Sequence, residues 1–126
     1  MTIPHGQCFI SVEDDIIFIK SVGAFNLEGI NKANQDIKEV ILNCDKKGLK
    51  LLIDYTEIEG ATPEAFDKLN ECNEWLNSQN LIAKAVVINS PVTLTLLESR
   101  APARRLQNDK NFEDKVTAIK WLKLQS

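Results

Sequence analysis

The sequence predicts a single α/β domain in which helices cover a mixed sheet of four or five strands. A length of 126 residues suits one domain, and no repeat or linker divides the chain, so we expect one domain over residues 1–126. Two short apolar segments open the chain, and strand-like and helix-like segments alternate after them. We therefore expect the order β-β-α-β-α-β-α-α, with an antiparallel hairpin at the N-terminus and a parallel core.

The N-terminal hairpin is predicted by two β-like segments that a charged turn separates. Residues 8–12 are apolar and alternate in character, whereas residues 16–19 form a nearly continuous β-branched run. The acidic residues 13–15 between them suit a hairpin turn, so the two strands should be antiparallel neighbours. Gly23 and Asn26 then mark a break before the first helix.

The first helix is predicted by apolar residues that recur every three or four positions. They form one stripe of roughly five turns: Leu27, Ile30, Ala33, Ile37, Val40, Ile41 and Cys44. Asn26 is a suitable N-cap, because its side chain can accept hydrogen bonds from the first free amides. Lys46, Lys47 and Gly48 should close the helix, with positive charge near its carbonyl end.

The middle of the chain is predicted to form a strand, a loop and a helix. Residues 49–55 are a short apolar run of the kind found in buried parallel strands. We expect residues 56–61, many of which are small or polar, to form a loop. Thr62 as cap, Pro63 at the first helical position and Glu64 in the first turn then open the second helix. Its stripe comprises Ala65, Phe66, Leu69, Cys72, Asn73 and Leu76.

The last third of the chain predicts one more strand and two more helices. Residues 81–88 are nearly all apolar and form the fourth strand, and the Ser-Pro pair at 90–91 opens the third helix. This helix should kink or end just before Pro102, which lacks an amide hydrogen and clashes with the preceding turn. Residues 114–124 predict a last helix, with its apolar side chains at helical spacing: Val116, Ile119 and Leu122.

Composition and charge favour a soluble, cytoplasmic protein. The net charge is −3 with both signs interspersed, which gives no pull toward nucleic acid or an anionic membrane. No segment approaches the ~18 consecutive apolar residues of a membrane span, and residues 1–6 do not resemble a secretory signal. Cys8, Cys44 and Cys72 form no zinc or disulfide pattern, so we expect reduced thiols and no metal.

The sequence offers little that would support catalysis. His5 is the only histidine and lies near the terminus, and the chain has no Walker loop, GxSxG or GxGxxG motif. The cysteines fall on predicted strand or helix stripes, where burial would leave them inert. We therefore expect a protein that is not an enzyme and that needs no cofactor.

Several segments together resemble a known family. They are residues 23–29 before the first helix, 51–54 in the third strand, 83–88 in the fourth strand, and 112–114 with 118–122 near the end. In these segments, and more loosely over nearly the whole chain, the sequence resembles the SpoIIAA-like group, relatives of STAS domains and of anti-sigma factor antagonists. The resemblance implies a SpoIIAA-like fold and a regulatory, non-catalytic role in binding another protein.

The resemblance also implies a phosphorylation switch, but the chain departs from its pattern. In the antagonists, the loop after the third strand ends in an Asp-Ser pair at a helix start, and that serine is phosphorylated to release a partner. Here Pro63 stands about where the phosphoacceptor would be. Thr62 is the nearest hydroxyl and a candidate phosphorylation site, because free amides at a helix start stabilise a phosphate. A role as helix cap explains the same residue.

An acidic segment is the first candidate binding surface. Glu57, Glu59, Thr62 and Glu64 follow the carboxyl end of a predicted parallel strand, where ligands of open α/β sheets commonly bind. Asp54, Glu57 and Glu59 could form an acidic patch for a cationic partner or a metal. Acidic residues so close together in a loop are also explained by simple solvation.

A basic segment is the second candidate surface. It contains three arginines: Arg100, Arg104 and Arg105. They would cluster if the third helix continued through Pro102, because residues four apart share a helix face. An anion, an acidic protein surface or a phospholipid headgroup could dock there. Glu98 and Asp109 are close enough in sequence to neutralise part of this charge.

Two functions remain open from the sequence. The first is a protein-interaction module that binds through the acidic segment. The second is a small carrier or sensor of an apolar or amphipathic ligand, in a pocket lined by Phe25, Trp75 and Trp121; the resemblance points to it, because the fold is related to lipid-carrying domains. A homodimer could accompany either function, since we expect the first strand or another sheet edge to be open for pairing.

Overall fold

The computed structural model describes residues 3–44 and 48–126 and places them around one mixed sheet. The sheet has five strands in the order β1-β2-β3-β4-β5. Their bounds are Gln7–Glu13, Ile16–Phe25, Leu49–Ala61, Leu81–Val87 and Asp109–Phe112. β1 and β2 pair antiparallel, and the other three neighbouring pairs are parallel. The expected hairpin, parallel core and order of elements are thereby confirmed.

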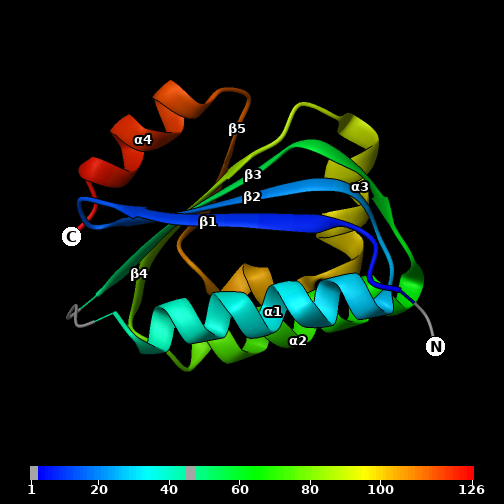
Figure 1. The fold of residues 1–126 in the computed structure, drawn as a ribbon. Coiled ribbons are helices and arrows are strands. Elements are labelled where there is room, and N and C mark those ends of the chain that lie inside the picture. Colours follow the sequence, from blue (N-terminus) through cyan, green and yellow to red (C-terminus); the bar gives the residue numbers. More distant parts are fainter. Residues whose placement is uncertain (1–2, 45–47) are drawn as a thin grey trace.

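Helices cover the two faces of this sheet unequally. α1 (Leu27–Leu42) and α2 (Pro63–Asn77) lie side by side on one face, and α4 (Lys115–Lys123) lies on the other (Figure 1). α3 (Pro91–Arg100) follows the carboxyl end of β4 and packs against α2 through its buried Leu97. α4 packs mainly on β4 and covers β2 only at its start, around Ile16 and Phe18, so the same face of β1 has no helix packed closely on it.

Side chains that alternate along the central strands contribute to an apolar core on each face of the sheet. In β2, Ile17 and Ile19 point toward α1 and α2, whereas Ile16 points toward α4. In β3, Leu51 packs with the first set and Leu52 with the second, and each is almost completely buried. Both faces of the central strands are therefore apolar, which explains their nearly continuous hydrophobic runs.

The helix starts agree with the sequence-based prediction. Asn26, Thr62, Ser90 and Asp114 each precede a helix, and each side chain accepts a hydrogen bond from the amide three residues later. α3 ends at Arg100, as Pro102 led us to expect. α1 ends earlier than predicted, at Leu42 with Asn43 as its C-cap, so Cys44 is not part of the helix. Lys46 and Lys47, which were expected to close it, lie outside the described residues.

Two segments that we expected to be irregular belong to strands. The expected loop at residues 56–61 is the second half of β3, and the expected break at Gly23 lies inside β2. The two segments pair with each other in parallel, from Val22 opposite Glu57 to Phe25 opposite Ala61. The register shifts once just before this stretch and once within it. Such irregularity makes a polar, glycine-containing strand hard to recognise from its own sequence.

The segment between α3 and α4 is also more ordered than expected. A short 3₁₀ helix, η1 (Pro102–Leu106), leads into β5, an edge strand of four residues. The amide of Lys84 donates to the carbonyl of Asn108 at 2.9 Å, and that of Ile88 donates to Phe112 at 2.8 Å. A polar strand this short carries no alternation signal, so only its pairing with β4 identifies it.

The N-terminal segment is held against the start of α1. The side-chain oxygen of Asn26 accepts from the amides of both His5 and Gly29 at 2.8 Å, and its side-chain amide donates to the carbonyl of Ile3 at 2.9 Å. Gly29 is buried at this contact, and a methyl group added to it would overlap the carbonyl oxygen of His5. Close approach of two backbones therefore requires glycine here.

Replacing Gly29 with alanine should destabilise the protein. Glycine to alanine in a helix interior ordinarily stabilises by roughly 1 kcal/mol, but here the new methyl group meets backbone, and overpacking of this kind costs about 1–3 kcal/mol. Urea unfolding measures the change. The same substitution in a chain that starts at Gly6 should be neutral or stabilising, and an equal loss in both backgrounds would contradict the proposed contact with His5.

Candidate functional site

The acidic residues predicted as a binding surface lie at the end of β3 and the start of α2. Glu57 and Glu59 are both exposed on the second half of β3. Glu57 forms an ion pair with Lys20 of β2. Glu64 is exposed in the first turn of α2. We call Glu57, Glu59, Thr62 and Glu64 the α2 entry surface.

Thr62 is tied into the fold by three hydrogen bonds. Its hydroxyl oxygen accepts from the amide of Ala65 at 3.2 Å, and its own amide donates to the carbonyl of Phe25 at 3.0 Å. Its carbonyl accepts from Phe66 at 3.1 Å. Thr62 therefore fixes where α2 starts relative to the end of β2. A phosphate on this half-buried hydroxyl would have to replace the cap bond to Ala65 with a new one.

The acidic surface extends further along α2 than the sequence analysis recognised. Four exposed acids follow one side of the helix at spacings of three and four: Glu64, Asp67, Glu71 and Glu74. We call them the acidic ridge. Lys68 pairs with Glu71 at 3.0 Å, so part of the charge is balanced. The three- and four-residue spacing of these acids is visible in the sequence, but the apolar stripe of the same helix is the stronger signal there.

The three arginines of the predicted basic surface do not act together. Arg100 is the exposed last residue of α3, whereas Arg104 and Arg105 belong to η1, so the continuous helix that would align them is absent. Nε of Arg104 donates to the carboxylate of Asp109 at 2.8 Å, and Nη2 donates to Asn111 at 2.9 Å. Arg104 is thus already bound to an anion of its own chain.

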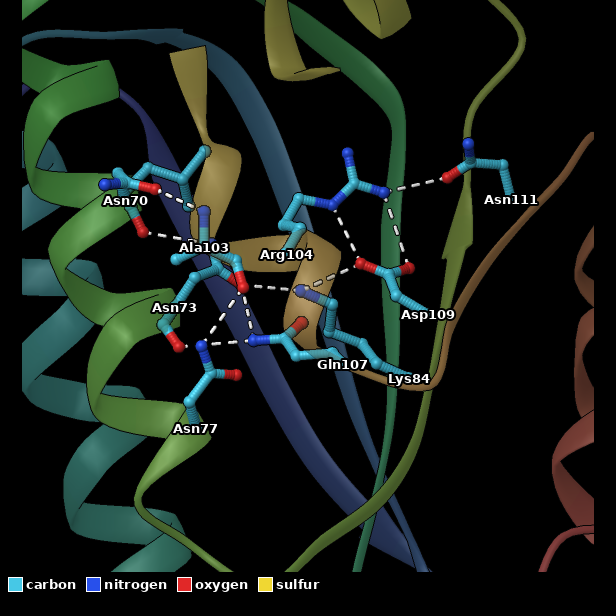
Figure 2. Close-up of polar contacts among 10 residues, drawn as sticks. Asn70, Asn73, Asn77, Lys84, Ala103, Arg104, Gln107, Asp109 and Asn111 are labelled. Atoms are coloured by element: carbon cyan, nitrogen blue, oxygen red, sulfur yellow. Dashed lines mark hydrogen bonds and ion pairs between the residues drawn. The ribbon is translucent and has the colours of Figure 1, made fainter. Parts of the chain in front are cut away.

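Arg104 belongs to a buried polar cluster between β4, β5, η1 and α2 (Figure 2). At its centre Lys84 of β4 is 1% exposed. Its ammonium group donates to the side-chain oxygen of Asn73 at 2.6 Å and lies 3.2 Å from the carboxylate of Asp109. Asp109 therefore holds two cations, Lys84 and Arg104, inside the protein.

Amide side chains of α2 complete the cluster and fasten η1. Asn70 accepts from the amide of Ala103 at 2.9 Å, and Asn77 donates to the carbonyl of Ala103 at 3.0 Å (Figure 2). The side chain of Gln107 donates to the backbone and side-chain oxygens of Asn73 at 3.2 and 3.3 Å. Asn70, Asn73 and Asn77 thus form one polar edge of α2 that faces η1.

Burial strongly perturbs Lys84. Loss of solvent lowers the pKa of its ammonium group to about 8, against the opposing effect of Asp109, which favours the charged form. An amine with such a pKa is suited to acid–base or nucleophilic chemistry where a substrate can reach it. Here the side chain is sealed by Asn73 and Asp109. We assign Lys84 a structural role on these contacts.

A small apolar cavity lies between the sheet and the helices α1, α2 and α3. It measures about 60 Å³ and is lined chiefly by aliphatic and aromatic side chains, with Asn34 as a polar member. The side-chain amide of Asn34 donates to the carbonyl of Lys68 at 3.0 Å. Its buried side-chain oxygen has no hydrogen-bond partner among the residues that the structure describes. The cavity can hold a few waters or a small organic group, since one water needs roughly 10–15 Å³.

The three aromatics expected to share a pocket are separated. Phe25 lines the cavity, and Trp75 packs in the core between the sheet and α1 and α2 without lining it. Trp121 is on the opposite face of the sheet, with its ring centroid 5.6 Å from that of Phe112. That expectation was wrong, because α4 and the pair α1–α2 pack on different faces.

The cysteines are buried or half-buried. Burial raises the pKa of the Cys8 and Cys72 thiols, which leaves both mostly protonated and weakly nucleophilic. Within residues 3–44 and 48–126, no three His, Cys, Asp or Glu side chains gather as a metal would need. The helices in this part of the chain are all too short or too polar to cross a bilayer.

Removing the carboxylate of Asp109 should lower the free energy of unfolding far more than removing an exposed charge does. Asp109→Asn leaves Lys84 and Arg104 buried without a counter-charge, and breaking a buried pair typically costs about 3–5 kcal/mol. Urea unfolding at neutral pH measures the loss. Arg105→Gln, at the exposed neighbour of Arg104, is the control and should change stability by less than about 0.5 kcal/mol. Similar effects of the two substitutions would contradict the cluster.

The lowered pKa of Lys84 should be visible in the pH dependence of the free energy of unfolding. Its pKa is about 8 when folded and 10.5 when unfolded, so between these values the unfolded chain binds more protons and stability rises with pH. Lys84→Met removes this effect but keeps the Arg104–Asp109 pair. From pH 8 to 10.5 the protein should gain stability relative to the variant, by on the order of 3 kcal/mol. Cys8 and Cys72 cause the opposite trend in both proteins, so it cancels when the free energy of unfolding of the variant is subtracted from that of the protein. If this difference did not change with pH, the burial of a charged Lys84 would be contradicted.

Three solved structures are similar to this chain over nearly its whole length. An uncharacterised DUF3478-family protein with a SpoIIAA-like fold, from Shewanella loihica PV-4, has a TM-score of 0.70 and 18% identity over 97% of both chains. An anti-sigma factor antagonist from Mycobacterium paratuberculosis has a TM-score of 0.71 and 14% identity, over 94% of this chain and 95% of its own. The anti-sigma factor antagonist SpoIIAA, in its unphosphorylated form, has a TM-score of 0.66 and 8% identity, over 94% of this chain and 99% of its own.

Sequence comparison adds no closer relationship. No protein-family model matches the chain, and no curated protein is significantly similar to it in sequence. The resemblance inferred from the sequence is confirmed at the level of structure, where identities of 8–18% carry the fold alone. The chain has the SpoIIAA-like fold.

Proposed function

We propose that this protein is a non-catalytic regulatory module that binds a protein partner through the α2 entry surface and the acidic ridge. The observation that carries the proposal is the acidic ridge itself, a row of exposed carboxylates that starts where β3 passes into α2. The similarity to two anti-sigma factor antagonists supports a module of this class. We further propose that it acts in the cytoplasm as a single domain.

The charge of this surface indicates the kind of partner. Glu59, Glu64, Asp67 and Glu74 are exposed acids that form no ion pair among the described residues. A partner with a complementary basic patch would be attracted over a distance of about one Debye length, ~8–10 Å, and held in a defined orientation. Binding should therefore be fast and should weaken as the salt concentration rises.

Reversing two of these charges should weaken binding. The partner is captured from the source cells by cross-linking, identified and purified, and its affinity is measured by isothermal titration calorimetry at two salt concentrations. Glu59→Lys with Glu64→Lys should raise the dissociation constant at least tenfold, because two attractive contacts become repulsive. The charge-matched control is Glu13→Lys with Glu113→Lys, at the end of β1 and before α4, where both acids are exposed. Equal affinities of the two double variants would contradict the placement.

Phosphorylation of Thr62 would be one way to regulate this surface. Thr62 lies at the start of α2, within the α2 entry surface, where a phosphate would meet free amides and add negative charge. Intact mass spectrometry of protein from its native cells should detect one added phosphate, and Thr62→Val should remove it. A phosphate that persists in the variant would place the modification elsewhere.

The cavity supports a second function, a carrier or sensor of a small amphipathic ligand. Asn34 is one of the lining residues, and its side-chain oxygen has no hydrogen-bond partner among the described residues. A free acceptor on a residue that lines an apolar space suits a ligand with an apolar body and one hydrogen-bond donor. Native mass spectrometry of gently purified protein, compared with the denatured mass, tests this function. An excess mass that disappears on denaturation would support it; equal masses, together with unchanged Trp fluorescence on titration with short-chain alcohols and fatty acids, would reject it.

A further inference from the structure

β1 is an edge strand whose outer side has no strand beside it among the described residues. Its pairing with β2 runs from Gln7 to Glu13 without a register shift, so the strand is regular along its length. Phe9 and Val12 are 56% and 45% exposed on this strand. A regular edge strand that exposes large apolar side chains is a template for another strand.

The two edges of the same sheet differ in their protection. β5, at the opposite edge, has only four residues and carries exposed Lys110. Short length and lysine are devices that prevent edge-to-edge pairing. β1 has seven residues and contains no lysine, arginine or proline, and its single charge, Glu13, is at its end. The protection is therefore missing at one edge, where an additional strand would fit.

The residues of β1 complement a second copy of themselves. When two β1 strands pair antiparallel about a two-fold axis at Ile10, all seven residues find a partner. Phe9 then faces Ser11 of the second copy, Cys8 faces Val12, and Gln7 faces Glu13. No two like charges are opposed. An axis at Ser11 would shorten the pairing and set Phe9 against Glu13, so the register at Ile10 is preferred.

The same pairing covers both exposed apolar side chains. Phe9 and Ser11 point to the sheet face that carries α4, in a hollow lined also by Phe18, Lys20 and Lys115. Across the axis the two Phe9 side chains are diagonal neighbours, at a separation that aromatic rings can bridge. Val12 points to the other face and meets Cys8 of the second copy.

We propose that two copies of this chain pair antiparallel through β1, with the axis at Ile10, and form one continuous sheet across the dimer. The proposal is independent of the α2 entry surface, which is on different elements. It explains why one edge of the sheet is unprotected and why its apolar side chains are exposed.

Analytical ultracentrifugation over a concentration series tests the assembly. The protein should sediment as a dimer of twice 14.2 kDa. Phe9→Lys should raise the dimer dissociation constant at least tenfold, because it brings two lysines together near the axis. Val92→Lys, at an exposed site on α3, should leave it unchanged. Circular dichroism establishes that both variants are folded. A monomer at all concentrations, or a dimer that Phe9→Lys does not weaken, would overturn the proposal.

A cross-link tests the register. In the proposed dimer, Val12→Cys places a thiol opposite the native Cys8 of the second copy, near the separation that a disulfide requires. Within one chain these positions are four residues apart on an extended strand and too far apart to bridge. Oxidation should give a dimer whose peptide map joins positions 8 and 12, whereas Val92→Cys should not yield it. A dimer without this link would overturn the register at Ile10.

Discussion

Lys84 lies in the middle of β4, and every other residue of this strand is apolar. Its charge must therefore be balanced inside the protein. Asp109 supplies the counter-charge, because its Oδ2 atom contacts both the ammonium group of Lys84 and Nε of Arg104. Asp109 begins β5 and Arg104 lies in η1. The ion pairs that balance the buried ammonium group of Lys84 therefore hold both segments in place. Removing two charges from water costs several kcal/mol per ion, and only good geometry and additional hydrogen bonds make the arrangement tolerable. Asn73 supplies one of those bonds from α2.

The cluster also explains how α2 can present a charged surface. α2 has three different edges. The apolar edge includes Phe66 and Leu76, and the amide edge includes Asn70 and Asn77. The acidic edge begins at Glu64. The first packs on the sheet and the second holds η1, so the third is free for solvent or a partner. The cap at Thr62 sets where this helix starts. A rigid helix with one acidic edge is a suitable surface for recognising a basic partner.

The features that could be predicted from the sequence are those that depend on residues close together in the chain. The caps and prolines that start α2 and α3 were correctly predicted, because each signal lies within a few residues of the helix it opens. The second half of β3 was taken for a loop, since Glu57 to Gly60 become a strand only by pairing with β2. Arg104 was grouped with exposed arginines because nothing in its neighbourhood shows that it turns toward Asp109. The choice of residues at the α2 entry surface stays a prediction, whereas their setting on β3 and α2 is now defined.

Native-state amide hydrogen exchange tests most directly whether the buried cluster locks η1 and β5 to the rest of the fold. The informative amides are those of Lys84 and Ile88, which bond to the β5 side, and of Ala103, which bonds to Asn70. We predict that they exchange only by global unfolding, with the same free energy as amides in β3. Exchange at a much lower free energy would show that η1 and β5 open independently and would contradict the central role of the cluster.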